Sequence, residues 1–257
     1  YIADYEAAIT EDTAALLRVH PSNFRVLGFT QAPTLEEMVE LGQRHNILVL
    51  HDIGSGCLLD TSQFDLAPEP TPQASVAAGV DLVFFSGDKL LGGPQSGMVV
   101  GRKDLVSALR RHPMARALRI DKLTLAALSA TLVHYVKEEA LSQVPVWRMI
   151  SMALEDIEAR ASSWAKGVGE VGRVIEGRST IGGGSLPGET LPTKLLAVAP
   201  PGDRGIDELA RRLRLGDPPV MGRIDEDTLL LDPRTVLPEQ DEALVPALQR
   251  ALAPDPM

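Results

Sequence analysis

The stretch DLVFFSGDKLLGGPQSGMVVGRKDLV, residues 81–106, places a lysine where an apolar run stops. Residues 81–85 and 97–101 are short apolar runs, which are typical of strands covered on both faces. Between the two runs, Lys89 is flanked by glycines and followed by a proline. The stretch therefore predicts two buried strands, with Lys89 at the carboxyl end of the first.

Working outward, the preceding sequence alternates between strand-like and helix-like segments. Residues 16–20 and 25–30 are expected to be strands, and residues 47–50 form another continuous apolar run. Residues 34–45 are expected to form a helix, in which Thr34 is the cap and Glu37 its partner three residues later. This β, α, β order with short connections predicts an α/β fold with a mainly parallel sheet.

The second half of the chain has a different pattern. Long helices are expected over residues 121–140 and 146–171, followed by short strands and helices at 207–215 and 239–252. This order indicates a small α+β domain. We expect the larger domain to cover residues 1–138 and the smaller one residues 139–257. The prolines and glycines between Ile181 and Pro192 are interpreted as turns within the second domain.

Composition limits the class of protein. The chain has 257 residues, 44% of them hydrophobic, and it has no apolar run of the roughly 18 residues that a membrane helix needs. No signal-peptide pattern is present. The single cysteine, Cys57, excludes an internal disulfide and fits a cytoplasmic protein. A net charge of −10 argues against a free-standing nucleic-acid binder. Because the chain opens at Tyr1 directly in a helix-like run, we expect that an N-terminal part is missing.

Three expected strand ends carry polar residues that would meet at one edge of a parallel sheet. These residues are Asn23, Asp52 and Lys89. Together they suit pyridoxal 5′-phosphate, which needs an amine for a Schiff base and a carboxylate beside its ring nitrogen. Asn23 could reach the ring oxygen, and Ser86 could bind the phosphate. The alternatives for each residue are ordinary turn chemistry and, for Lys89, a solvated loop.

Positive charge gathers in residues 110–122, where Arg116 and Arg119 are three residues apart and would share a face of a helix. Paired arginines bind tetrahedral oxyanions through forked donors. The alternative is an ordinary solvated helix face.

Other reactive residue types give weaker signals. Cys57 is interpreted as a small buried hydrophobe, and Trp147 and Trp164 as core or interface residues. The histidines show no metal-ligand spacing, so no metal site is expected. The run IGGGS at residues 181–185 lacks the lysine of a phosphate loop and is interpreted as a tight turn.

Several segments together indicate a family. VHPSNFRVLGFT (19–30), LVLHDIGSG (48–56), FFSGDKLLGGPQSGMVVGRKDL (84–105) and RALRIDKLTLAALSATL (116–132) resemble bacterial selenocysteine synthase, the L-seryl-tRNA(Sec) selenium transferases. GGGSLPGETLPT (182–193) and LLLDPRTV (229–236) extend the resemblance, more loosely, over nearly the whole chain.

The resemblance implies a fold-type I pyridoxal phosphate transferase. Lys89 would be the Schiff-base lysine, Asp52 the partner of the ring nitrogen and Asp88 a helper in proton transfer. Arg116 and Arg119 match arginines near the site for the selenophosphate anion. The implied substrates are seryl-tRNA(Sec) and selenophosphate, and the implied assembly is a homo-oligomer, a ring of dimers with a shared active site. Family members also carry an N-terminal tRNA-binding domain.

Two other functions remain open at this stage. One is a related pyridoxal phosphate enzyme that acts on a free amino acid without tRNA. The other is a non-catalytic assembly partner that keeps the fold and binds no cofactor.

Overall fold

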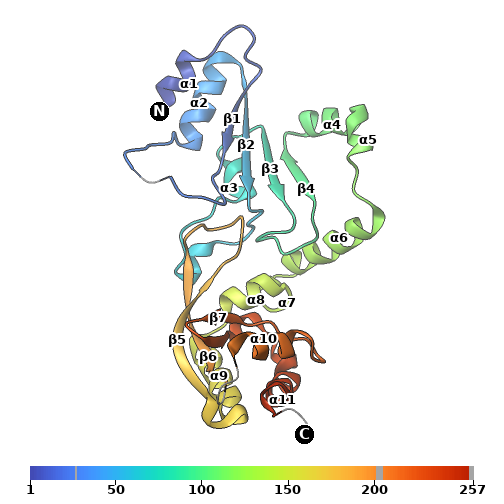
Figure 1. Ribbon diagram of the computed structural model, residues 1–257. Coiled ribbons are helices and arrows are strands. Elements are labelled where there is room, and N and C mark those ends of the chain that lie inside the picture. The colour runs from blue at the N-terminus through green and yellow to red at the C-terminus, as the bar shows by residue number, and fades with distance from the viewer. Residues whose placement is uncertain (27, 201–204, 255–257) are drawn as a thin grey trace. The chain divides into compact units, whose positions relative to one another are not determined.

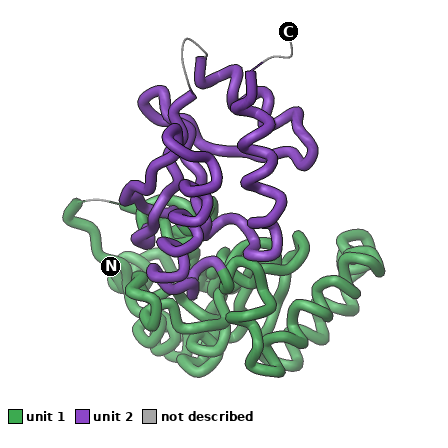
Figure 2. Tube along the Cα trace, turned by 90° about the horizontal axis from the view of Figure 1, so that it is seen from below, with its two compact units in different colours: residues 1–148, 181–189 green, residues 149–180, 190–257 purple. Residues whose placement is uncertain are grey.

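The computed structural model describes residues 1–26, 28–200 and 205–254. The chain forms two compact units, each of which is described by itself (Figure 2). Unit 1 consists of Tyr1–Arg148 and Ile181–Glu189, and unit 2 consists of Met149–Thr180 and Thr190–Met257. The domain boundary expected between residues 138 and 139 stays a proposal.

Unit 1 is built on a four-stranded sheet in the order β1-β2-β3-β4 (Figure 1). β1 and β2 are parallel, β2 and β3 are parallel, and β4 runs antiparallel to β3. The predicted α/β class with a mainly parallel sheet is confirmed. The strands are β1 (Ala15–Val19), β2 (Leu48–Gly54), β3 (Leu82–Ser86) and β4 (Gly97–Gly101). The helices are α1 (Ile2–Ala7), α2 (Leu35–His45), η1 (Thr61–Phe64), α3 (Pro72–Ala77), α4 (Lys103–Arg111), α5 (Pro113–Ala117), α6 (Lys122–Val136) and α7 (Ala140–Gln143), and α8 (Pro145–Ser151) spans the division between the units.

Local sequence determines the bounds of α2. The Thr34 side chain accepts a hydrogen bond from Glu37 N, and the Glu37 carboxylate accepts one from Thr34 N, so the predicted capping box is present. Asn46 ends the helix in the left-handed conformation, at φ 55°. The helix buries Met38 and Leu41 completely against the sheet core. At about 1.5–3 kcal/mol for each fully buried large side chain, this face holds the helix in place.

Unit 2 is built on an antiparallel sheet in the order β5-β6-β8-β7. This matches the expected small α+β unit. Its strands are β5 (Gly172–Thr180), β6 (Thr190–Val198), β7 (Arg223–Asp225) and β8 (Thr228–Leu231). Its helices are α9 (Leu154–Val168), η2 (Gly169–Val171), α10 (Ile206–Arg214), η3 (Pro233–Thr235), η4 (Pro238–Gln240) and α11 (Asp241–Leu252). Trp164, Leu196, Leu209, Leu229 and Leu248 form the centre of its core.

The segment that joins β5 to β6 does not stay with its own unit. The glycines and prolines of this segment predicted turns inside the second domain, but Ile181–Glu189 groups with unit 1. The segment is held there by Glu189, which accepts hydrogen bonds from Arg25 Nη2 and from Ala67 N. Leu186 and Ser185 are buried in the same place.

Two expected elements differ from the structure. Residues 25–30 contain no strand at the described positions, and residue 27 lies outside the description. The single helix expected over residues 146–171 is two helices, because Ala153 takes an extended conformation before α9. Arg234 binds backbone carbonyls at the end of α8, including Met149 O at 2.6 Å and Met152 O at 3.4 Å. A side chain distant in sequence thus satisfies carbonyls that a continuous helix would bond internally.

Among residues 1–26, 28–200 and 205–254, no helix combines the length and the apolar character required to cross a bilayer.

Candidate active site

The parallel register places the ends of β1, β2 and β3 side by side at one edge of the sheet. Val19, the last residue of β1, lies opposite Asp52 of β2, and Asp52 lies opposite Phe84 of β3. A bulge between Asp52 and Gly54 shifts the register just before β2 ends. The loops that follow the three strands therefore start from neighbouring positions, as expected for a ligand site in an open α/β sheet.

Lys89 follows β3 by three residues, and its side chain lies between two glycines. A Cβ built on Gly54 would lie 3.7 Å from Lys89 Nζ, and one built on Gly184 would lie 2.9 Å from Lys89 Cε. Both glycines have positive φ angles, +66° and +81°. Lys89 is half-buried and forms no hydrogen bond or ion pair with any residue that the structure describes. Its amine is therefore available to a ligand.

The loop that carries Lys89 is fixed by its own backbone. Gly87 N donates to Ser96 O at 2.9 Å, and Leu90 N donates to Ser55 O at 3.0 Å. Gly92 has a φ of +75°, and a Cβ there would lie 2.4 Å from a methyl carbon of Val144. The glycine at 92 thus makes room for protein packing, Gly54 makes room for the Ser22 hydroxyl, and Gly184 makes room for the lysine.

The other predicted site residues lie around the same edge. Asp52 is half-buried, and its Oδ1 accepts a hydrogen bond from Gly54 N at 3.0 Å. Asn23 is exposed in the turn after β1, and Ser86 is the half-buried last residue of β3. Asp88 is exposed beside Lys89. The structure therefore brings both Asp52 and Lys89 next to Gly54. No hydrogen bond among the described residues joins Asn23 to either of them, and the role of Asn23 stays a prediction.

A cavity of about 400 Å³ opens beside Lys89. Asp88, Lys89 and Leu90 form one wall, and Gly182, Gly183 and Ser185 form another. No residue within 4 Å faces the position of a Cβ on Gly182 or Gly183, so the glycine run is an open backbone wall. The turn predicted for IGGGS is present, but its packing against the lysine was not foreseen.

The segment that carries Arg116 and Arg119 begins at the other end of the strands from Lys89. β4 runs antiparallel, so its last residue, Gly101, pairs with Leu82 at the start of β3. The chain therefore enters α4 and α5 from the edge of the sheet opposite to Lys89, and both helices lie outward of β4 (Figure 1). The two arginines were expected on one helix, but α5 ends at Ala117, and Arg119 lies in the link to α6. Both are exposed.

The break after α5 has a local cause. The Asp121 carboxylate accepts hydrogen bonds from Leu123 N at 2.8 Å and Thr124 N at 3.0 Å, and so begins α6 as a separate helix.

Comparison with known proteins identifies the family of the chain. The profile of the family described as L-seryl-tRNA selenium transferase matches residues 1–237. The chain belongs to this selenium transferase family.

Curated members of the selenium transferase family show the same relationship over nearly the whole chain. The L-seryl-tRNA(Sec) selenium transferase of Moorella thermoacetica is 48% identical over 259 residues, which is 98% of this chain and 55% of that protein. The corresponding protein of Geobacter sulfurreducens is 47% identical over 96% of this chain and 54% of its own length. The chain thus spans about half the length of the curated relatives that it matches.

A solved structure, D-glucosaminate-6-phosphate ammonia-lyase, shares the fold with a TM-score of 0.60. It is 21% identical, and the match covers 98% of this chain and 61% of that one.

In this member of the selenium transferase family, two titratable residues near the site, His51 and Cys57, are buried and contribute to packing. His51 is buried, and its Nδ1 lies 3.0 Å from Ser75 Oγ of α3. Burial, with smaller effects from Arg18 and His20, lowers the pKa of His51 to about 4. Burial likewise raises the pKa of the Cys57 thiol to about 12, and its Sγ donates to Leu59 O. Both results agree with a packing role.

The prediction that the two tryptophans lie in the core is also confirmed. Trp147 and Trp164 are fully buried, and Trp147 Nε1 donates to Tyr135 Oη at 2.7 Å. The described residues contain no cluster of histidine, cysteine and carboxylate groups able to hold a metal ion.

Sequence reasoning overlooked two contributors to the site of this selenium transferase family member. Ser22 is buried, and its Oγ would lie 2.7 Å from a Cβ on Gly54, on the side where Lys89 Nζ also lies. Gly184 packs against the lysine side chain. The only sequence signal for Ser22 was a hydroxyl at a strand end, and no local signal linked residue 184 to residue 89.

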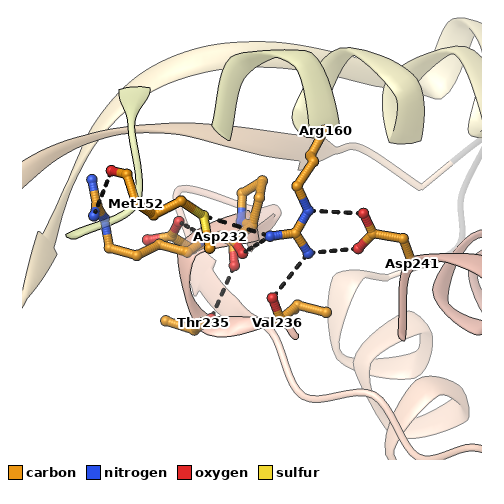
Figure 3. Close-up of polar contacts among 8 residues, drawn as sticks. Met152, Arg160, Asp232, Thr235, Val236 and Asp241 are labelled. Atoms are coloured by element: carbon orange, nitrogen blue, oxygen red, sulfur yellow. Dashed lines mark hydrogen bonds and ion pairs between the residues drawn. The ribbon is translucent and has the colours of Figure 1, made fainter. Parts of the chain in front are cut away.

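A second polar cluster lies in unit 2 and is structural (Figure 3). Arg160 of α9 binds both carboxylate oxygens of Asp241, at 2.6 and 2.8 Å, and also donates to Pro233 O and Val236 O. Asp232 accepts hydrogen bonds from the hydroxyls of Ser179 and Thr193. These side chains bind one another and the backbone, so the cluster fastens α9 and the strands to the segment after β8.

Proposed function

We propose that the intact protein converts L-seryl-tRNA(Sec) to L-selenocysteyl-tRNA(Sec), with selenophosphate as the selenium donor and pyridoxal 5′-phosphate as the cofactor. The observation that carries this proposal is the half-buried amine of Lys89, which has no partner among the described residues and lies beside Gly54, whose N–H group donates to Asp52. Family membership and the names of the relatives support the choice of substrate.

The residues at the strand ends fit the cofactor. Lys89 would attach its aldehyde carbon, and Gly184 leaves the space in which the lysine side chain lies. Asp52 is already oriented by Gly54 N and would hold a proton on the ring nitrogen. Asn23 would donate to the ring oxygen, and Ser86 would bind the phosphate. When bound, pyridoxal phosphate supplies the electron sink that makes the α-proton of the serine acidic.

The chain's own groups would then move protons and exclude water. Lys89 lines the cavity and would hold or accept a proton there as a base. Asp88 is exposed in the cavity wall beside Lys89 and would assist proton transfer to the leaving hydroxyl. The backbone of Gly182 and Gly183 closes the opposite wall without side chains, which leaves room for an ester-linked substrate.

Arg116 and Arg119 would bind the selenophosphate anion through forked donors. Because α4 and α5 leave the sheet at the edge opposite to Lys89, we propose that these arginines complete the site of a second copy. A homo-oligomer with shared sites, a ring of dimers, follows from this assignment. We place the reaction in the cytoplasm, where aminoacyl-tRNA is available and a buried thiol such as Cys57 stays reduced.

The test is selenium transfer by the intact protein loaded with cofactor. Seryl-tRNA, selenophosphate and purified protein are incubated, and selenocysteyl-tRNA is measured in the wild type, in Lys89→Ala and in Lys103→Ala. Lys103 is an exposed lysine on α4 and serves as the matched control. We expect transfer in the wild type and the control, and none in Lys89→Ala.

Two outcomes would replace the proposal. Turnover of free serine with none of seryl-tRNA would indicate an enzyme acting on a free amino acid. A folded wild-type protein that binds no cofactor and turns over neither substrate would indicate a non-catalytic assembly partner.

A further inference from the structure

A second cavity of unit 1, about 560 Å³ in volume, is larger than the one beside Lys89. It lies between the loop after β1, the loop that precedes α3 and the Ile181–Glu189 segment. Most of its walls are apolar, and none of the roles assigned above uses it. Its size is that of a small-molecule site, since such sites occupy about 300–1,000 Å³.

One carboxylate in the lining of this cavity has an oxygen without a hydrogen-bond partner among the described residues. The Glu69 side chain is 3% exposed, lines the cavity, and forms no hydrogen bond through Oε1 with any described residue. His20 Nε2 lies 3.4 Å from that oxygen, within ion-pair distance, but also lacks hydrogen-bond geometry to a partner. A buried polar atom without a partner costs about 1–3 kcal/mol of stability. Such atoms are rare in native proteins and require an explanation.

The walls of the cavity suit a flat ring. Pro21, Pro68 and Pro187 contribute rigid apolar faces, and Phe24 contributes an aromatic ring that is 55% exposed. Bases of single-stranded nucleic acid stack on aromatic side chains of this kind. The Arg25 guanidinium, paired with Glu189, adds a planar cation to the same lining.

The cavity adjoins the candidate active site through a short piece of chain. His20 N donates to Asp52 O at 2.7 Å, and Ser22 N donates to His20 O at 2.8 Å. Ser22 Oγ and Lys89 Nζ both flank Gly54. His20, which lines this cavity, is thus two residues from Ser22, whose hydroxyl lies beside Gly54 as Lys89 Nζ does.

We propose that this cavity binds the base of the 3′-terminal adenosine of the aminoacyl-tRNA. The proposal rests on the proposed function, because the serine of seryl-tRNA is an ester of that nucleoside's ribose. The Glu69 carboxylate accepts a hydrogen bond from the exocyclic amine, and His20 Nε2 donates to the neighbouring ring nitrogen. This acceptor and donor pair matches the adenine edge, whereas uracil and guanine present a carbonyl oxygen where the carboxylate lies.

The experiment measures the binding of single nucleotides to the intact, cofactor-loaded protein by calorimetry. The probes are AMP, CMP, GMP and UMP, which carry the same phosphate and differ only in the base. We expect AMP to bind about tenfold more tightly than UMP or GMP. CMP shares the amine but has a smaller ring, so it should lie between them.

Two variants test the named residues. Glu69→Leu removes the acceptor at nearly constant volume and should abolish the preference for AMP. Because it also removes an unpartnered buried oxygen, its thermal unfolding midpoint should not fall below that of the wild type. Phe24→Ala removes an exposed ring and should weaken the binding of AMP about tenfold. Glu40→Leu, at an exposed position of α2, is the matched control and should leave AMP binding unchanged.

Several results would overturn the proposal. Equal affinity for the four nucleotides, unaffected by Glu69→Leu, would show binding through phosphate alone. A large fall in the unfolding midpoint of Glu69→Leu with unchanged AMP affinity would show a purely structural role. Selenium transfer by a protein that binds the four nucleotides equally would reject this cavity as the adenine site and leave the proposed function intact. AMP selectivity without selenium transfer would support the cavity while rejecting the proposed function.

Discussion

The polar residues at the strand ends of unit 1 and the polar cluster of unit 2 differ in whether their side chains have hydrogen-bond partners. In unit 2, Arg160 gives bidentate hydrogen bonds to Asp241 and donates to two backbone carbonyls. In unit 1, Ser55 Oγ, Glu69 Oε1 and His20 Nε2 are buried without hydrogen bonds among the described residues. Two of these three follow the ends of β1 and β2 directly, where the Lys89 amine also lacks a partner.

The difference separates groups that hold the fold from groups that are free to bind a ligand. Unit 2 also has unpartnered atoms, Arg234 Nε and Trp164 Nε1. Arg234, however, uses its other nitrogens on backbone carbonyls, and Trp164 lies in the core. Polar atoms left unpaired around a strand-end loop are therefore the stronger sign of function.

The largest effect on activity is expected from Asp52→Asn. This change keeps the shape and removes the charge that would face the cofactor ring, and electrostatic groups of this kind are worth about 10²–10³ in turnover. The measurement is the rate of selenium transfer with saturating cofactor. Asp12→Asn, at an exposed position before β1, is the control and should retain the wild-type rate. Equal rates in the two variants would remove Asp52 from the site.

The largest effect on stability is expected from Arg160→Ala in unit 2. The Arg160 side chain is 13% exposed and that of Asp241 is 27% exposed, so the change leaves a partly buried carboxylate without its partner. Breaking such a pair costs about 3–5 kcal/mol. Urea unfolding measures the loss.

The control for Arg160 is Lys194→Ala in the same unit. Lys194 is 19% exposed, but its two partners, Glu176 and Glu158, are 89% and 55% exposed, and pairs with exposed carboxylates contribute less than about 1 kcal/mol. Similar losses in both variants would contradict the contrast between buried and exposed pairs.

The next effect is a dependence of stability on pH that arises from His51. The pKa of His51 is about 4 in the folded protein and 6.5 in the reference state, so the unfolded chain binds the proton first. Stability from this residue is complete above pH 6.5, falls as the pH drops toward 4, and is constant below that. The total corresponds to about 3 kcal/mol. The wild type is compared with His51→Gln by urea unfolding across this range, and parallel curves would contradict the assignment.

The smallest effect separates two neighbouring glycines of the cavity wall. Gly184 has a φ of +81°, and its Cβ would lie 2.9 Å from Lys89 Cε, whereas Gly183 has open space around its Cβ position. Gly184→Ala should cost about 1–2 kcal/mol and weaken cofactor binding, because the lysine must move. Gly183→Ala should be nearly neutral for stability. Equilibrium unfolding and a cofactor titration measure both, and equal behaviour would reject the contact with Lys89.

Local signals in the sequence were sufficient for α2 and for the strands β2, β3 and β4 of unit 1, whereas the strand expected over residues 25–30 is absent at the described positions. The capping box at Thr34 and the apolar runs at β2, β3 and β4 predicted their positions, and the order of strands predicted that Asp52 and Lys89 lie at the carboxyl ends of neighbouring strands. Asp52 was expected just after its strand, but β2 continues to Gly54 and includes it.

Features set by distant residues could not be predicted in this way. The break at Ala153 depends on Arg234, and the packing of Gly184 depends on Lys89. The burial of Glu69 depends on how the loop after η1 folds back, with Glu69 N bonded to Thr61 Oγ1. Each of these pairs residues without a periodic pattern or a motif to connect them.

The most direct test of the central claim is to locate the bound cofactor. The intact protein is loaded with pyridoxal phosphate and reduced with borohydride, and its peptides are analysed by mass spectrometry. The account predicts a pyridoxyl group on Lys89 and on no other lysine, whether among Lys103, Lys122, Lys137, Lys166 and Lys194 of this sequence or elsewhere in the intact protein. A label on another lysine, or no label on a folded protein, would contradict it.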